Sequence, residues 1–316
     1  MKIGIVGAGL VGATCAYSLV MRGIGREIVL VDADRKRSDA QANDIFHAVP
    51  FAHPLRVVSG EISDLSGCDI VVMAAGVSQK PGEPRIDLLG RNAGIFKQII
   101  PQILHHAPGA IIVVATNPVD IMTHIAAHYA RRDGVSSTRV IGSGTTLDTA
   151  RFRTLVGTHL GVDPQHIHGY VIGEHGDTKV LAWSAVRVGG MSLDDFCRDQ
   201  NCSINEEIKH DIDDKVRGAA LHIIEGKGAT YYGIGSALAR IVDVIIHDQR
   251  AILTVCTQET DVEGIPDITL SLPHILGGSG IIKTLGIPLS EEEHDLLTAS
   301  AESIKETLSG LQIFTT

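Results

Sequence analysis

Short apolar runs alternate with helical patterns along the first half of the chain. Runs rich in Ile and Val predict strands over residues 2–6, 27–32, 55–59, 69–74, 110–115 and 139–141. Apolar residues at helical spacing predict helices over residues 10–22 and 86–105. Strands that are apolar on both faces and flanked by helices are typical of a parallel sheet covered on both sides. The pattern therefore predicts a doubly wound α/β domain over residues 1–142.

The second half of the chain has longer helical patterns and shorter apolar runs. Helices are predicted over residues 146–160, 205–225 and 229–247, a strand over 167–172, and an antiparallel pair of strands over 251–257 and 268–276. Ser290 and Glu293 form a capping-box sequence ahead of a final helix. We expect an α+β substrate domain over residues 143–316, packed closely on the first because no Pro- or Ser-rich linker separates them.

The composition limits the class of protein. Hydrophobic residues make up 44% of the 316 residues and the net charge is −10, which suits a globular protein and excludes intrinsic disorder. The acidic excess argues against a dedicated nucleic-acid or anionic-membrane binder. Five cysteines without a CxxC pair predict free thiols in a cytoplasmic setting, and no metal site. Residues 3–21 are uncharged, but their four glycines favour a folded domain over a signal peptide.

A glycine-rich turn follows the first predicted strand. Gly7, Gly9 and Gly12 fit the GxGxxG pattern between a strand and a helix, and Asp32 ends the next strand 20 residues after Gly12. Such glycines let backbone N–H groups approach a pyrophosphate, and a carboxylate at that strand end accepts hydrogen bonds from a ribose diol. Together these features predict a Rossmann dinucleotide-binding domain that prefers NAD to NADP. The basic residues 35–37 weaken this preference, because they offer a place for a 2′-phosphate.

The candidate chemistry lies in three polar segments, residues 79–85, 142–151 and 173–177. A loop punctuated by Pro and Gly ends at Arg85, and such a loop can close over a substrate. A hydride transfer between a hydroxy acid and a nicotinamide needs a base, a carboxylate that orients it, a cation on the carbonyl oxygen and a second cation on the substrate carboxylate. In that order, the candidates are His175, Asp148, Arg85 and Arg151. Any one of them alone is more simply structural, so the hypothesis depends on the set.

Six motifs give a resemblance to a known family. They are GAGLVG (residues 7–12), QKPGEPR (79–85), TNPVD (116–120), GSGTTLDTARFR (142–153), GEHGDT (173–178) and KGATYYGI (227–234). On these motifs the chain resembles the lactate/malate dehydrogenase family, and within it the bacterial L-lactate dehydrogenases. The resemblance implies an NAD-dependent oxidoreductase that interconverts (S)-lactate and pyruvate, in the setting of glycolysis and fermentation.

The resemblance also implies roles for individual residues. His175 would be the proton acceptor and donor, Asp148 its partner, Arg85 a residue of a mobile loop and Arg151 the partner of the substrate carboxylate. It adds Gln79, Asn117 and Thr230 at the substrate. At NAD it places Gly7, Gly9, Val11, Gly12, Asp32, Arg37, Gly76, Val77, Ala115, Thr116, Asn117, Ser143 and Ile234. One departure is Pro84, which replaces the family's usual threonine and is expected to stiffen the loop.

Gln79 bears on which acid the site accepts. Malate dehydrogenases, which this chain also resembles, have an arginine at this position, opposite the second carboxylate of oxaloacetate. A neutral amide would leave that carboxylate buried without its partner, which is strongly unfavourable. Gln79 and Thr230 together therefore favour pyruvate. Malate dehydrogenase is the nearer alternative, and a non-catalytic NAD-binding relative the further one.

Two residues outside the active-site set bear on regulation. In the bacterial enzymes that the chain resembles, residues matching Arg153 and His168 form a fructose 1,6-bisphosphate site between subunits. On a helix Arg153 points about 200° away from Arg151, so we expect it to face a neighbouring subunit or solvent. His168 is expected on the strand that leads to His175. We expect a homotetramer activated by this ligand; the alternative is that both residues form ordinary surface ion pairs.

Overall fold

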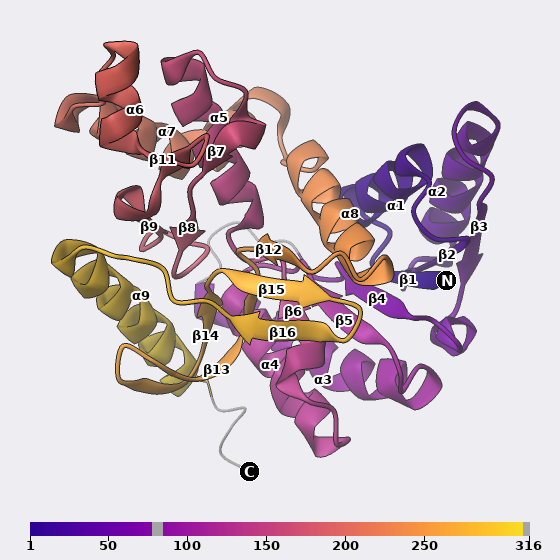
Figure 1. Cartoon of the computed structure of the whole chain (residues 1–316). Coiled ribbons are helices and arrows are strands. Elements are labelled where there is room, and N and C mark those ends of the chain that lie inside the picture. The colour runs from indigo at the N-terminus through magenta and orange to yellow at the C-terminus, as the bar shows by residue number, and fades with distance from the viewer. Residues whose placement is uncertain (78–84, 312–316) are drawn as a thin grey trace.

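A large, mainly parallel sheet forms the centre of the molecule in the computed structural model, which describes residues 1–77 and 85–311 (Figure 1). Its strands are β1 (Lys2–Val6), β2 (Glu27–Val31), β3 (Arg56–Gly60), β4 (Ile70–Met73), β5 (Ile111–Val114), β6 (Val140–Gly142), β13 (Cys256–Val262) and β14 (Ile265–Ser271). Over the described residues their order is β14-β13-β6-β5-β4-β1-β2-β3. The strands β1 to β6 pair in parallel, and the β13–β14 hairpin joins the β6 edge in the antiparallel sense. The predicted doubly wound sheet is confirmed.

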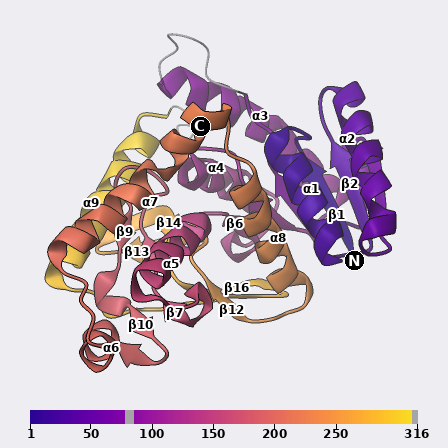
Figure 2. The same ribbon diagram turned by 90° about the horizontal axis from the view of Figure 1, so that it is seen from above.

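Helices cover both faces of this sheet. Ile3 and Ile5 of β1 belong to the core beneath α1 (Leu10–Arg22), α2 (Arg35–Ala48) and α8 (Tyr232–Ile246). Val6 of the same strand points to the opposite core, which also holds residues of α3 (Arg85–His106), α4 (Val119–Arg132) and α9 (Glu291–Ser309). Figures 1 and 2 both show α1, α2 and α8 together on one side of the sheet. The near-continuous Ile and Val runs of the strands follow from this burial on both faces.

A smaller unit beside the sheet has its own apolar core. It comprises α5 (Thr146–Leu160), α6 (Leu193–Gln200), α7 (Glu206–Lys227) and the short strands β7 (Ile167–His168), β8 (Val171–Ile172), β9 (Val180–Leu181), β10 (Arg187–Val188) and β11 (Met191–Ser192). Phe152 of α5 is fully buried there and meets the Trp183 ring edge-on, with 4.7 Å between ring centroids. This unit gives the second half the α+β character that its sequence predicts. Among the described helices, none is long and apolar enough to cross a membrane.

Three of the predicted strands are wrong as single strands. Residues 167–172 divide into β7, which pairs with β10, and β8, which pairs with β9. Residues 251–257 divide between β12 (Ala251–Leu253) and β13, and residues 268–276 between β14 and β15 (His274–Gly277). The strands β12, β15 and β16 (Gly280–Thr284) form a separate sheet. Most residues of these runs are buried or half-buried, with His168 and Ile252 exposed, so an apolar run continues where the chain leaves one sheet for another.

The two halves of the chain share the central sheet. The β13–β14 hairpin and α8 come from the second half, yet they extend the sheet and cover one of its faces. Contact between α1 and α8 is close, because a Cβ atom at Gly235 would lie 2.5 Å from Thr14 Cγ2. At the start of α9 the capping box is present, with Ser290 and Glu293 each accepting a hydrogen bond from the other's backbone N–H. The halves therefore pack closely, as the absence of a linker suggests.

Candidate active site

A groove of about 960 Å³ lies at the carboxyl edge of the parallel strands. Its lining includes Gly7, Gly9, Asp32, Arg37, Gly76 and Val77, all of which the resemblance assigns to the cofactor. Gly7 has φ of +103°, and a Cβ atom there would lie 2.5 Å from the Ala75 nitrogen. At Gly12 a Cβ atom would lie 1.9 Å from the Gly7 carbonyl oxygen, so the turn and α1 meet too closely for any side chain. The backbone at Gly9 is open, since an added Cβ atom would meet nothing within 4 Å.

Asp32 fixes the shape of the groove. Its Oδ2 accepts the Ala8 N–H at 2.7 Å and its Oδ1 accepts the Asp34 N–H at 2.9 Å. Each carboxylate oxygen has a second lone pair, so the group still accepts hydrogen bonds from a ribose diol. Arg37 Nη1 lies 3.9 Å from Asp32 Oδ1, and its side chain is 53% exposed. The glycine turn, the acidic strand end and the open groove thus fit the adenosine and pyrophosphate parts of NAD.

Other residues assigned to the cofactor lie at the same edge or against the neighbouring core. Ala115, Thr116 and Asn117 follow β5, and Ser143 follows β6. Thr116 is held by the bond from its hydroxyl to the Ala75 carbonyl, at 2.7 Å. The side chains of Val11, Ala115 and Ile234 are partly buried against the core beneath α1 and α8. Thr230, which the resemblance places at the substrate, is half-buried in the loop between α7 and α8.

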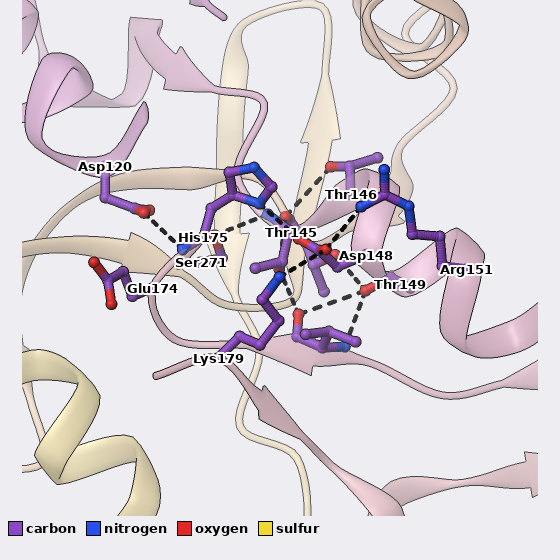
Figure 3. Close-up of polar contacts among 12 residues, drawn as sticks. Asp120, Thr145, Thr146, Asp148, Thr149, Arg151, Glu174, His175, Lys179 and Ser271 are labelled. Atoms are coloured by element: carbon purple, nitrogen blue, oxygen red, sulfur yellow. Dashed lines mark hydrogen bonds and ion pairs between the residues drawn. The ribbon is translucent and has the colours of Figure 1, made fainter. Parts of the chain in front are cut away.

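The structure brings His175 and Asp148 together (Figure 3). His175 Nδ1 lies 2.6 Å from Asp148 Oδ2. Asp148, in the first turn of α5, is fully buried, whereas the His175 side chain keeps 24% of its surface exposed. An ionised carboxylate only accepts, so Nδ1 carries the proton of this bond and Nε2 is left as the basic nitrogen.

Asp148 has cationic partners on its other oxygen. Lys179 Nζ lies 3.0 Å and Arg151 Nη1 lies 3.2 Å from Asp148 Oδ1. Burial alone raises the pKa of Asp148, but the hydrogen bond and charge of His175 and the charge of Lys179 outweigh it and lower the pKa to about 2. Asp148 is therefore ionised at neutral pH, which is the state that orients an imidazole and stabilises its charged form.

Three elements of the fold hold the His175 segment in place. Gly173 pairs with Ser271 of β14 through two backbone hydrogen bonds of 2.9 and 3.0 Å. The Ser271 hydroxyl accepts the Thr145 N–H at 3.0 Å, just before α5 begins. The His175 N–H donates to Asp120 Oδ2 at 2.7 Å, in the first turn of α4. Because α4 and α5 both start at the carboxyl edge of the sheet, the His175–Asp148 pair lies at the edge that also forms the groove.

Two residues of this constellation escape sequence reasoning. Asp120 belongs to the TNPVD motif but its carboxylate shows its role only in the structure, where burial raises its pKa to about 6 despite the bond from the His175 N–H. Lys179 precedes an apolar stretch and has no sequence signal of its own, because its partner Asp148 is 31 residues away. Only folding brings these groups to His175.

Several predicted site residues lie outside the described residues or away from the pair. Gln79 and Pro84 fall outside them, and Arg85 starts α3 with a side chain that the structure does not describe. Arg153 Nε donates to the Gly169 carbonyl at 2.9 Å, and its guanidinium lies 5.4 Å from the Tyr170 ring centroid. His168 is exposed on β7, so the expectation that it shares a strand with His175 is wrong.

Comparisons with known proteins agree with this geometry. Residues 1–142 match the family model "lactate/malate dehydrogenase, NAD binding domain", and residues 145–314 match "lactate/malate dehydrogenase, alpha/beta C-terminal domain". The chain is 54% identical to an L-lactate dehydrogenase of Geotalea daltonii, over 99% of this chain and 100% of the relative. It is 51% identical to an L-lactate dehydrogenase of Thermus aquaticus, over 98% of this chain and 99% of the relative.

Solved structures give the same result. A crystal structure of a minor L-lactate dehydrogenase from Enterococcus mundtii, in a ligand-bound form, superposes with a TM-score of 0.93 at 36% identity. The match covers 99% of this chain and 98% of that chain. A lactate dehydrogenase from a deep-sea metagenome also superposes with a TM-score of 0.93, at 36% identity over 98% of both chains.

Proposed function

Because the chain belongs to the lactate/malate dehydrogenase family and its first half is an NAD-binding domain, we propose that it interconverts (S)-lactate and pyruvate with NAD. The observation that carries this proposal is the 2.6 Å bond between His175 Nδ1 and Asp148 Oδ2, with Arg151 beside it. Its relatives of 54% and 51% identity are both named L-lactate dehydrogenase, which supports the choice of acid.

In lactate oxidation, His175 Nε2 accepts the hydroxyl proton. NAD, when bound, would supply the acceptor for the hydride that leaves the carbon bearing this hydroxyl. Asp148 Oδ2 stabilises the imidazolium that results, and the buried bond keeps the ring pointed at the substrate. In the reverse direction the imidazolium returns the proton to the carbonyl oxygen of pyruvate. One histidine thus carries the proton both ways.

Arg151 is the proposed partner of the substrate carboxylate. Its side chain is 18% exposed, and one of its N–H groups donates to Asp148 Oδ1. The other N–H groups of the planar guanidinium remain for a bidentate contact with the substrate carboxylate. Arg85 is the proposed cation for the carbonyl oxygen, and Asn117 and Thr230 are proposed to complete the pocket. Gln79 is proposed to face the methyl group of pyruvate, where malate dehydrogenases have an arginine.

Steady-state NADH oxidation with pyruvate and with oxaloacetate tests this function. We expect kcat/KM to be higher for pyruvate, and Gln79→Arg to shift the ratio toward oxaloacetate at least tenfold, which corresponds to about 1.4 kcal/mol. A parent that prefers oxaloacetate would identify a malate dehydrogenase. A parent that reduces neither acid would identify a non-catalytic relative.

We further propose a homotetramer activated by fructose 1,6-bisphosphate. Half-buried Arg153 lies on α5 and exposed His168 on β7. Arg187 of β10 is opposite His168 in the backbone register of the β7–β10 strand pair. A bisphosphate between copies of this surface would offset the repulsion of the cations and favour the assembled state. The test compares the KM for pyruvate and the sedimentation profile with and without millimolar ligand, in the parent and in Arg153→Gln. If the ligand changes neither the KM nor the sedimentation profile of the parent, the proposed activation is wrong.

The remaining assignments are also proposals. We place the division between an NAD-binding domain and a catalytic domain at residues 142 and 143, near the junction of the two matched family models. We propose a cytoplasmic location, in keeping with cysteines that are free in the described structure. The roles of individual cofactor residues stand on the groove and on the resemblance.

A further inference from the structure

A buried lysine lies behind the proposed proton-transfer pair. Lys179 directly precedes β9, and its side chain is 8% exposed. An ammonium group at this depth is strongly destabilising unless it is paired. Within the described part of the chain, its ion-pair partner is Asp148 Oδ1, at 3.0 Å. The buried ammonium group is thus paired with the same carboxylate that binds His175.

The two oxygens of Asp148 face different partners. Oδ2 holds His175, and Oδ1 receives both Lys179 and Arg151. Lys179 therefore gives Oδ1 a cationic partner besides Arg151, whose remaining donors are proposed to bind the substrate carboxylate. Figure 3 shows Lys179 and Arg151 reaching the carboxylate from different elements.

The lysine is itself anchored from a distant helix. Arg217 of α7 donates to the Lys179 carbonyl at 2.8 Å and to the Asp177 carbonyl at 2.8 Å. Arg217 in turn pairs with Asp213 at 3.5 Å, and Asp213 accepts the Trp183 indole N–H at 3.1 Å. This network fixes the backbone that carries the ammonium group, so the lysine presents a preset charge to Asp148.

We propose that Lys179 is a positioning residue for the proposed reaction: it holds Asp148 in register with His175 and sets the pH range over which the pair works. The inference rests on the proposed function. Its physical basis is that a cation on Asp148 reduces the stabilisation that this carboxylate gives to the imidazolium. Removal of the charge should therefore favour the protonated ring. Among the residues that the structure describes, the other charged groups near the pair are Asp120 from α4, Arg151 from α5, and Glu174 and Asp177 beside His175. Asp213 and Arg217 from α7 lie against the backbone that carries Lys179.

The test measures kcat/KM for pyruvate against pH in the parent and in Lys179→Met, Lys179→Gln and Lys179→Arg. Pyruvate reduction needs the protonated ring, so its alkaline limb should move to higher pH by about one unit in the two neutral variants. Lys179→Arg should keep the parental limb. The matched control is Lys215→Met, which removes the same charge from an exposed ion pair with Asp211 on α7.

A second readout separates this inference from the proposed function. NMR titration of the His175 ring, assigned by its loss in His175→Asn, follows the same proton without turnover. If the parent fails to reduce pyruvate, the proposed function is wrong, while the titration still tests Lys179. A limb and a titration midpoint in Lys179→Gln that match the parent would overturn the inference. So would a Lys179→Arg variant that behaves like the neutral ones.

Discussion

At the scale of single residues, two buried carboxylates near His175 have opposite environments. Asp148 has a pKa lowered to about 2, because bonds and charges from His175 and Lys179 outweigh its burial. Asp120 has a pKa raised to about 6, because burial outweighs the backbone N–H that it accepts. Neighbouring carboxylates whose pKa values are shifted in opposite directions are a common feature of sites that transfer protons.

The raised pKa of Asp120 makes the stability of the protein depend on pH. Its pKa in the folded chain is raised from 3.8 to about 6, so its contribution to stability is full below about pH 4 and lost as pH rises through 6. Asp120→Asn keeps an oxygen for the His175 N–H but removes the charge. The free energy of unfolding of the variant, relative to the parent, should therefore rise by about 2 kcal/mol between pH 4 and pH 7. Urea unfolding across this range is the measurement.

The exposed Asp295→Asn variant is the matched control, because Asp295 lies at the surface of α9. Its stability difference from the parent should change little over the same range. A difference for Asp120→Asn that stays constant with pH would show that the carboxylate is not destabilised by burial.

The sequence predicts some of these residues and not others, for a physical reason. His175, Asp148 and Arg151 belong to distinctive motifs, and the structure brings all three together. Lys179 and the carboxylate of Asp120 act only through contacts between distant segments, 31 and 55 residues apart. Local sequence carries no information on such contacts.

At the scale of elements, Glu293 links the last helix to the smaller unit. Its Oε2 accepts the Ser290 N–H at 2.9 Å in the capping box, and its Oε1 accepts the Ser184 N–H at 3.0 Å. The capping box is visible in the sequence, whereas the bond to Ser184 crosses 109 residues and is not. The sequence thus predicts where α9 begins but not what its first turn holds.

Because Glu293 accepts two hydrogen bonds, its loss should destabilise the protein more than the loss of Ser290. Ser290→Ala removes one cap bond and should lower the free energy of unfolding by about 1 kcal/mol. Glu293→Ala leaves two N–H groups without an acceptor and should lower it by about 2–4 kcal/mol. Chemical denaturation measures both, with exposed Glu292→Ala as the control. Equal losses for Ser290→Ala and Glu293→Ala would contradict the link to Ser184.

At the level of the whole molecule, the two halves share one sheet and one of its cores. The β13–β14 hairpin and α8 from the second half complete the sheet of the first. The sequence predicts the parallel order of elements, yet it does not show that the later strands return to the same sheet. Apolar periodicity reports burial and not the identity of the partner.

Shared packing predicts a single unfolding transition. The only tryptophan in the sequence, Trp183, lies in the smaller unit, so its fluorescence reports on that unit while far-UV circular dichroism reports on the whole chain. At one protein concentration the two midpoints should coincide. Separate midpoints would show that the halves unfold independently.

His175 is proposed to carry the proton in both directions of lactate–pyruvate interconversion. The most direct measurement is kcat/KM against pH for pyruvate reduction and for lactate oxidation, in the parent and in His175→Asn, with NADH binding followed by fluorescence. As pH rises, kcat/KM for reduction should fall and kcat/KM for oxidation should rise through one common midpoint. His175→Asn should lose about 10²–10⁴-fold in kcat while NADH binding is retained. A His175→Asn variant with the parental kcat would contradict this role of His175. So would a parent in which both directions change with pH in the same sense.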